Sequence, residues 1–393
     1  MKDIKRVQLS EIVELITKGT TPTTLGYEFQ DEGVNFLKIE CFDENGGFIE
    51  SKIAHISEEC HKRLNRSQLK TGDILFSIAG AIGRVAIVTE EMLPANTNQA
   101  LAIIRISDEQ IYLPYIKLIL TSPMIIEQFE RKKQGVAQLN LSLKDINEIL
   151  IPLPSKDKQI ELAELFDKVL GVISKRNKEL SALEKLIKAR FVEMFGDPIL
   201  NEKEWSCVMI TDVCQLILGG GTPSKKCEEF FKGKIPWVTP KDMKQSIIND
   251  SIDHITEDAI VHSTTNLIPI WSVLMVIRSG ILKHALPVAI NSIPVTINQD
   301  MKAFIPGENI TAEFLMYFFK AIEEDVLSKV RGVTADNIDF KTFQKREIIV
   351  PPMELQNQFA AFVTQVDKSK AAVQKALDEA KLLFDSLMQE YFG

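Results

Sequence analysis

The chain has 393 residues, of which 45% are hydrophobic and 25% are charged, and its formal net charge is −8. This length predicts two or three domains, each with a core of its own, while the acidic balance excludes a broad basic surface as the source of affinity for nucleic acid. No apolar run approaches the roughly 18 residues of a membrane helix and the first residues lack the apolar stretch of a signal peptide, so we expect a cytoplasmic protein without membrane contact.

A long internal repeat organises the sequence. The segment Gly19–Pro22 recurs as Gly220–Pro223, and Thr97–Gln99 recurs as Ile297–Gln299, at offsets of 201 and 200 residues. A period this long is too large for a solenoid repeat. The chain is therefore expected to contain a tandem pair of similar domains.

Within each copy, short apolar strands alternate with helices, which predicts the α+β class. The expected strands include 74–78 and 101–106 in the first copy and 273–277 and 303–305 in the second, and the expected helices are 112–120 and 312–322. Each copy then reaches a strand that ends in prolines, at 149–154 and at 348–352. A long charged helix follows each strand and has a glutamine near its start, Gln159 in the first and Gln358 in the second.

Both long helices carry apolar residues at alternating steps of four and three, which is the heptad pattern of a coiled coil. The first series is Leu162, Phe166, Val169, Ile173, Arg176, Leu180, Leu183 and Ile187, and the second is Phe359, Phe362, Val366, Ser369, Val373, Ala376, Ala380, Leu383 and Leu387. Two matched series in one chain are expected to pair antiparallel. At about 1.5 Å rise per residue they would form a rod of roughly 50 Å, comparable to about 15 base pairs of DNA. The alternative is a packing or dimerisation coiled coil with no measuring role.

Further apolar residues widen the stripe on these helices beyond a two-helix contact. A wider stripe predicts that helices of partner proteins bind there. The candidate partner-binding residues are Leu165, Val172, Leu186, Phe191, Leu382 and Phe384.

Motifs for catalysis, metal binding and disulfides are missing from the sequence. The glycine-rich segment 219–225 has a proline where a phosphate-binding loop needs backbone donors, and it lacks the Gly-Lys order of such a loop. An adenine methyltransferase would show a glycine-rich cofactor loop and an Asn/Asp-Pro-Pro-aromatic motif, whereas Val350–Met353 has neither the amide nor the aromatic residue. The five histidines and five cysteines have no metal-ligand spacing. We therefore expect no catalytic residue, no metal, and cysteines that are reduced, packed thiols.

The order and duplication of the motifs resemble the specificity subunits of type I restriction-modification systems over essentially the whole chain. The segments that carry the resemblance are Gly221–Ser224, Ile235–Met243, Thr296–Gln299, Gly332–Thr334, Ile348–Pro352, the helix from Gln356 and the junction Phe195–Pro198. The first copy departs more from the pattern, with Lys38–Glu40 and Gly135–Ala137 in place of the Thr-Pro-Lys and Gly-x-Thr segments.

The resemblance implies a pseudo-twofold chain in which two target recognition domains alternate with two long antiparallel coiled-coil helices. The first target recognition domain would span 1–154, the central spacer helix 155–196, the second domain 197–352 and the distal spacer helix 353–393. Each domain would read one half of a split site in double-stranded DNA, and the helices would dock two methyltransferase subunits. The chain itself would be non-catalytic and hold no cofactor. S-adenosylmethionine would bind the methyltransferase subunits, and motor-nuclease subunits would join to cleave unmodified DNA.

Candidate DNA-binding residues are basic or polar side chains in or near the repeated loops. Lysines around Thr222 would contact phosphates, whereas Arg278 would donate to guanine. The set is Lys62, Arg63, Arg66, Arg84, Thr222, Lys225, Lys226, Lys241, Arg278, Ser279, Lys283 and Thr334. A second basic run lies at Arg131–Gln134, and for this run and for the one around Lys62 a solvated charged face is the alternative.

Residues that differ between the copies are better specificity candidates than residues that recur. Arg84 stands opposite His284 at an offset of 200, with Lys283 beside it. By contrast, an Asn-Gln pair recurs in both copies and is expected to form structural hydrogen bonds, at Asn98, Gln99, Asn298 and Gln299.

Two other classes of function stay open on the sequence. One is a coiled-coil scaffold that does not bind DNA and whose duplicated domains bind peptides. The other is an enzyme whose site is too irregular to recognise, which turnover by the purified chain would reveal.

Overall fold

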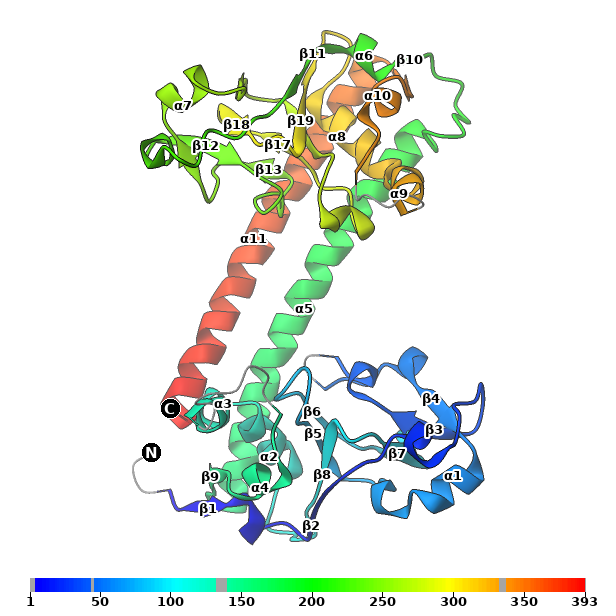
Figure 1. The fold of residues 1–393 in the computed structure, drawn as a ribbon, viewed down its shortest axis with the longest axis vertical. Helices are drawn as coiled ribbons and strands as arrows, with labels where there is room; N and C mark the ends of the chain where they lie inside the picture. Colours follow the sequence, from blue (N-terminus) through cyan, green and yellow to red (C-terminus); the bar gives the residue numbers. More distant parts are fainter. Residues whose placement is uncertain (1–3, 44–45, 132–139, 332–336, 393) are drawn as a thin grey trace. The chain divides into compact units, whose positions relative to one another are not determined.

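The computed structural model describes residues 4–43, 46–131, 140–331 and 337–392 of the chain (Figure 1). The chain divides into two compact units. Unit 1 comprises Met1–Asn177 with Lys375–Gly393, and unit 2 comprises Lys178–Gln374. Both units mix sheets and helices, as expected for the α+β class.

Unit 1 is built on an antiparallel sheet and a smaller mixed sheet. The antiparallel sheet has the order β2 (Leu15–Lys18), β8 (Leu101–Arg105), β5 (Ile74–Ser77), β6 (Val85–Ile87). The mixed sheet has the order β4 (Ala54–Ile56), β3 (Val34–Leu37), β7 (Ala95–Thr97), with β3 and β7 parallel. A two-stranded ribbon joins β1 (Arg6–Gln8) to β9 (Leu150–Pro152). The helices are α1 (Glu58–Arg63), α2 (Leu113–Leu120), α3 (Pro123–Arg131) and α4 (Leu143–Asn147).

Unit 2 repeats this plan with two additional strands. Its larger sheet has the order β11 (Cys214–Gly219), β19 (Met301–Pro306), β16 (Val273–Val276), β17 (Val288–Asn291), β13 (Ile247–Ile248). Its smaller sheet has the order β14 (His254–Ile255), β12 (Ile235–Val238), β18 (Val295–Ile297), β15 (Leu267–Ile268). A ribbon joins β10 (Cys207–Met209) to β20 (Glu347–Ile349). The helices are α6 (Ile210–Val213), α7 (Glu257–Val261), α8 (Ala312–Ala321), α9 (Glu323–Arg331) and α10 (Phe340–Phe343).

Matching hydrogen bonds confirm that the sequence repeat is a repeat of structure. In unit 1 the amide of Ile78 donates to the carbonyl of Ala100 at 2.9 Å, and in unit 2 the amide of Ile277 donates to Asp300 at 2.8 Å. Parallel pairing also recurs, between β3 and β7 and between β12 and β18. Strands β13 and β15 are the additions of unit 2, and each extends the edge of a sheet.

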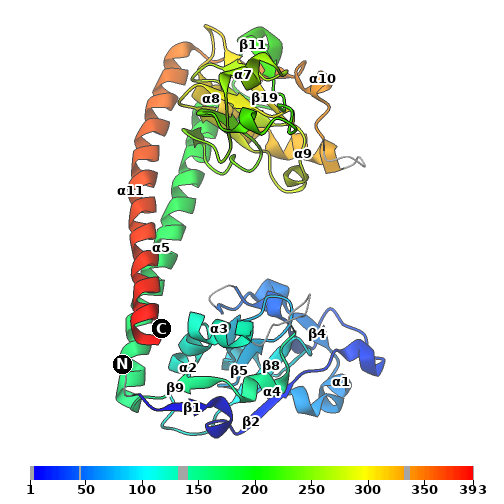
Figure 2. The same cartoon turned by 60° about the vertical axis from the view of Figure 1, so that its left-hand side comes forward.

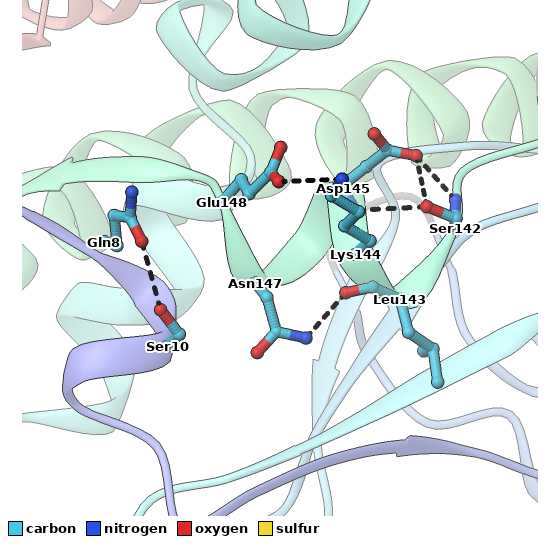
Figure 3. A network of polar contacts seen from close by, with 8 residues as sticks. All are labelled: Gln8, Ser10, Ser142, Leu143, Lys144, Asp145, Asn147 and Glu148. Carbon is cyan, nitrogen blue, oxygen red and sulfur yellow. Dashed lines mark hydrogen bonds and ion pairs between the residues drawn. The ribbon is translucent and has the colours of Figure 1, made fainter.

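Ser142 caps the start of helix α4, where two side chains accept from backbone amides that have no partner within the helix (Figure 3). The Ser142 hydroxyl accepts from the Asp145 amide at 3.2 Å, and the Asp145 carboxylate accepts from the Ser142 amide at 2.9 Å. This reciprocal capping box stabilises a short helix. Helix α4 is followed directly by β9, which pairs with β1.

Each long helix is continuous and contributes to both units. Helix α5 runs from Lys156 to Phe195 and α11 from Met353 to Phe392, and the division between the units falls inside both. Among the described residues, we find no helix that combines the length and apolar content required to cross a bilayer.

The two helices lie side by side and antiparallel within each unit (Figure 2). In unit 1 the ring of Phe166 lies 5.5 Å from that of Phe384 and 5.7 Å from that of Phe392. In unit 2 the ring of Phe359 lies 5.5 Å from the rings of both Phe191 and Phe195. These aromatic contacts join the helices to the core of each unit.

The apolar series predicted for the first helix matches its burial, whereas the series predicted for the second is shifted by one residue in places. Leu162, Phe166, Val169 and Ile187 are buried. In α11, however, Ser369 and Leu383 are exposed, and Val363 and Leu377 are buried instead. The buried face of α11 is hard to recognise in the sequence because one of the positions that it turns toward α5 is occupied by a charged residue, Lys370.

Lys370 is tolerated at that position because the aliphatic side-chain carbons of a lysine can pack against apolar neighbours while its ammonium group pairs with carboxylates. The ammonium lies 3.5 Å from the Glu184 carboxylate on α5 and 3.8 Å from that of Asp367 on α11. Lys320 on α8 belongs to the same cluster and donates to the Ser246 hydroxyl at 2.8 Å. Burial, and then the nearby charge of Lys370, lower the pKa of Lys320 from 10.5 to about 8, while burial raises the pKa of Asp367.

A buried glutamine fixes the start of each long helix to the globular part of its unit. Gln159 accepts from the Tyr112 amide at 2.9 Å and donates to the carbonyl of Pro154 at 2.9 Å. Gln356 does the same in unit 2, accepting from the Thr311 amide at 2.9 Å and donating to Pro351 at 2.8 Å. The prediction that Gln358 is the counterpart of Gln159 was wrong, because Gln358 is exposed and Gln356 makes the equivalent hydrogen bonds.

The substitution Gln356→Ala should destabilise unit 2, because it leaves the Thr311 amide and the carbonyls of Pro351 and Asn309 without their partner. We expect a loss of about 3 kcal/mol in the free energy of unfolding, or roughly 10 °C in the melting temperature. The matched control is Gln358→Ala on the same helix, which should change stability by less than about 0.5 kcal/mol. Equal losses in the two variants would contradict this role for Gln356.

Because the pKa of Lys320 is lowered in the folded state, the free energy of unfolding should increase with pH. Between pH 8 and 10.5 the unfolded state holds the Lys320 proton and the folded state has released it, so folding becomes more favourable as pH rises. The wild type should therefore gain stability relative to Lys320→Met between pH 8 and 10. Chemical denaturation of both proteins at several pH values measures this difference, and a constant difference would show that the lysine does not titrate in that range.

Candidate nucleic-acid interface

Four loops of unit 2 meet at the ends of its two sheets. The Gly221 amide donates to the Ile297 carbonyl at 3.0 Å, and the Thr222 hydroxyl donates to the Gln299 side chain. The Asn298 amide donates to Val238 at 3.0 Å, and the Arg278 amide donates to Asp300 at 3.2 Å. The Thr-Pro loop, the end of β12, the loop after β16 and the Asn-Gln loop are thus held together.

Glycine is required where the first of these loops touches the Asn-Gln loop. A Cβ on Gly220 would lie 2.1 Å from the Asn298 carbonyl oxygen and 2.2 Å from that of Ile297. In unit 1 a Cβ on Gly19 would lie 1.8 Å from the Thr97 carbonyl oxygen. The repeated glycines therefore allow two backbone segments to approach each other closely.

The same loops meet in unit 1. The Thr20 amide donates to Thr97 at 3.2 Å, and the Thr21 hydroxyl donates to the Gln99 side chain at 2.5 Å. The Thr97 hydroxyl donates to the Leu37 carbonyl at 2.8 Å, and the Ile78 amide donates to the Ala100 carbonyl at 2.9 Å. Each unit thus presents one framework of loops at the same place in its fold.

The prediction that the recurring Asn-Gln pairs form structural hydrogen bonds is confirmed. The Asn98 side chain accepts from the Ala100 amide at 3.1 Å, and that of Asn298 accepts from the Asp300 amide at 3.1 Å. Gln99 and Gln299 accept from the threonines of the Thr-Pro loops. These residues shape the framework in both units.

Arg278 lies on this framework and is held by a carboxylate that the sequence reasoning missed. Its Nε and Nη2 atoms both lie 2.6 Å from Oδ1 of Asp300. The arginine side chain is 52% exposed and the aspartate 23% exposed. The sequence did contain a signal for Asp300, because residues that differ between the two copies are the better specificity candidates. The matching position of the first copy is the uncharged Ala100.

Strand register corrects the pairing of Arg84 with His284. The Ser77 amide donates to the Arg84 carbonyl, and the equivalent Val276 amide donates to Pro287. Arg84 therefore corresponds to Pro287, because the loop before β17, which contains the 3-10 helix Gly280–Lys283, is longer than its counterpart. The Arg84 side chain is half-buried.

The other predicted DNA-binding residues lie on exposed turns and short helices of their units. Lys62 and Arg63 end α1, and Arg66 follows in a 3-10 turn; all three are exposed. In unit 2 the exposed lysines are Lys225, Lys226, Lys241 and Lys283, and Ser279 caps the 3-10 helix that contains Lys283. Thr334 and the run 132–134 lie outside the described residues.

Two predicted partner-binding residues are unsuited to that role because they belong to the cores of the units. Phe191 is 2% exposed and stacks at 5.5 Å on Phe314. Phe384 is half-buried against Phe166. Leu165 is also half-buried, whereas the exposed fractions of Val172, Leu186 and Leu382 are 45%, 48% and 71%.

The described residues contain no cluster of three or more His, Cys, Asp or Glu that could hold a metal ion. All five cysteines are free thiols. Cys41 and Cys60 are buried, and burial raises the pKa of Cys214 to about 12. The expectation of packed thiols was wrong for Cys207, which is exposed.

The substitution Gly220→Ala should destabilise unit 2, since the new Cβ meets backbone oxygens that cannot rotate away. We expect a loss of about 1–3 kcal/mol, measured by thermal unfolding. Gly280→Ala is the control, because nothing lies within 4 Å of its added Cβ and its φ is outside the left-handed region. If both variants unfold at the wild-type temperature, the close approach at Gly220 is not needed.

Comparison with known proteins identifies relatives over most of the chain. The family model described as the type I restriction modification DNA specificity domain matches residues 1–185 and 202–381. The specificity subunit of type I restriction enzyme EcoR124I/EcoR124II from Escherichia coli is 32% identical over 282 residues, covering 69% of this chain and 67% of that protein. The MjaIX specificity subunit from Methanocaldococcus jannaschii is 30% identical over 189 residues, covering 46% of this chain and 43% of that protein.

Solved structures share the fold along nearly the whole length. A chain from a study of complex assembly and conformational transition of the type I R-M system has a TM-score of 0.58 at 18% identity, covering 98% of this chain and 96% of that one. The S subunit of a type I restriction-modification system from M. genitalium has a TM-score of 0.57 at 14% identity, covering 100% of this chain and 97% of that one.

Proposed function

The chain belongs to the family of type I restriction-modification DNA specificity subunits, and we propose that each of its two units reads one half of a bipartite DNA site. The observation that carries this proposal is the duplicated loop framework, whose backbone contacts recur while its charged side chains differ. A protein that recognises two different short sequences needs this combination of common support and variable contacts.

Exposed basic residues would bind the phosphates on either side of the bases that are read. In unit 1 these are Lys62, Arg63 and Arg66, and in unit 2 they are Lys225, Lys226 and Lys241; the half-buried Arg84 would add a further contact in unit 1. Phosphate contacts fix the position of a protein on the duplex but carry no sequence information. Partner subunits would supply the rest of the affinity, because the chain carries a net charge of −8.

The long helices would set the distance between the two half-sites. Each has 40 residues, which at about 1.5 Å per residue gives about 60 Å of helix. We propose that α5 and α11 form an antiparallel coiled coil along their length and relate the units by pseudo-twofold symmetry. A continuous helix is suited to this role because it resists bending.

The exposed apolar residues of these helices would dock two methyltransferase subunits. Val172, Leu186 and Leu382 are large apolar side chains that stay substantially exposed, as do Val192 and Leu383. Large apolar side chains that stay exposed are candidates for contact with a partner protein. In this assembly the methyltransferase subunits would hold S-adenosylmethionine and modify adenine, motor-nuclease subunits would join for cleavage, and this chain would supply sequence specificity without catalysis.

Methylome sequencing of cells with and without this chain tests the proposal directly. We expect deletion to remove one bipartite adenine-methylated motif while all other methylated motifs remain. Persistence of every motif in the deletion strain would contradict the proposed function.

A second arm of this experiment assigns the half-sites. Residues 205 to 350 are exchanged for those of a divergent relative, and the same sequencing is repeated. Only one half of the motif should change, with the other half and the spacer unchanged. Changes in both halves would contradict the assignment of one half-site to each unit.

A further inference from the structure

We infer that Arg278 and Asp300 together determine one base of the half-site read by unit 2, with Arg278 donating to guanine and Asp300 positioning it. This inference rests on the proposed function. It adds a residue, Asp300, whose role is to fix the direction in which the guanidinium points.

Asp300 is itself held firmly by the loop framework. Its carbonyl accepts from the amides of Ile277 at 2.8 Å and Arg278 at 3.2 Å, and its amide donates to the Asn298 side chain at 3.1 Å. Its Oδ2 atom accepts from the Asn298 amide group at 3.0 Å. The remaining carboxylate oxygen, Oδ1, is the one that binds the guanidinium.

The contact uses one edge of the guanidinium and leaves another for a ligand. Nε and Nη2 face Asp300, so within the part of the chain that the structure describes, the edge formed by Nη1 and Nη2 remains directed away from the carboxylate. That edge carries two parallel N–H donors. Such a pair matches the O6 and N7 acceptors that guanine presents in the major groove.

Unit 1 shows that the framework forms without this charge pair. Position 78 corresponds to 277, since the amides of Ile78 and Ile277 bind equivalent carbonyls and their own carbonyls accept from Leu141 and Ile338. Arg278 therefore corresponds to Ala79, and Asp300 to Ala100. Both charges are absent together from unit 1, although the backbone hydrogen bonds of Ile78 match those of Ile277.

The pair is thus better explained by recognition than by folding. An ion pair with one partner half-exposed contributes little to stability. A carboxylate beside the arginine also repels phosphate, which argues against a contact to the DNA backbone. What the carboxylate supplies is a fixed direction for the donors, which favours selection of a base.

The test uses the full chain, expressed with its methyltransferase subunits in cells that lack the system, and reads the motif by methylome sequencing. The variants are Arg278→Ala, Arg278→Lys, Asp300→Ala and the double variant of both alanines. Lys329→Ala is the control, because Lys329 forms an exposed ion pair in the same unit. Thermal unfolding checks that each variant is folded, and Arg278→Lys keeps the test valid if Arg278→Ala fails to fold.

We expect the wild-type motif to contain a guanine in the half assigned to unit 2, and Arg278→Ala to relax discrimination at that position by about tenfold to a hundredfold. Arg278→Lys should relax the same position, because lysine lacks the fork. Asp300→Ala should also relax it, with an unchanged melting temperature, and the double variant should be no worse than Arg278→Ala. The other half of the motif should be unaffected.

Three results would overturn the inference. They are an unchanged motif in all variants, a uniform loss of methylation without a change of base preference, and the absence of guanine from the unit 2 half. The proposed function fails separately, since in that case the wild-type chain itself would direct no bipartite methylation.

Discussion

A buried glutamine at the first turn of each long helix is the constraint on which the rest of each unit depends. Burying an uncompensated amide is costly, so Gln159 and Gln356 hold their positions only with their full sets of partners. Those partners are the proline-terminated strand before the helix and the turn before the main helix of the globular part. The direction in which each long helix leaves its unit is therefore fixed by hydrogen bonds as well as by packing.

In the proposed role, the loops of each unit would separate structural support from DNA recognition. Close backbone approach at Gly19 and Gly220, and the Thr-to-Gln hydrogen bonds, occur in both units. Charged side chains do not recur in this way, and the clearest example is Arg278 with Asp300 against two alanines. Because the scaffold forms with or without the charges, a change of specificity need not disturb folding.

Sequence reasoning could identify the repeat, the mixed class and the two long helices because each rests on a local pattern. It failed where a distant partner decides the outcome. Lys370 takes an inner helix position through Glu184, which no hydropathy pattern indicates, and Gln356 rather than Gln358 is buried because Thr311 and Pro351 bind it. Arg84 was misaligned because the loop before β17 is longer in unit 2, which only strand register reveals.

The acidic balance of the chain also bears on why Arg278, in its proposed role at a base, would be paired with a carboxylate. Specificity depends on the difference between binding to the correct site and binding to all other DNA, and phosphate contacts strengthen both. An unpaired arginine would add to both, whereas Arg278 paired with Asp300 gains little from phosphate and keeps its hydrogen-bonding edge. In the proposed role, a low net attraction for DNA is thus compatible with sharp discrimination, because exposed lysines and partner subunits supply affinity and the paired arginine supplies selection.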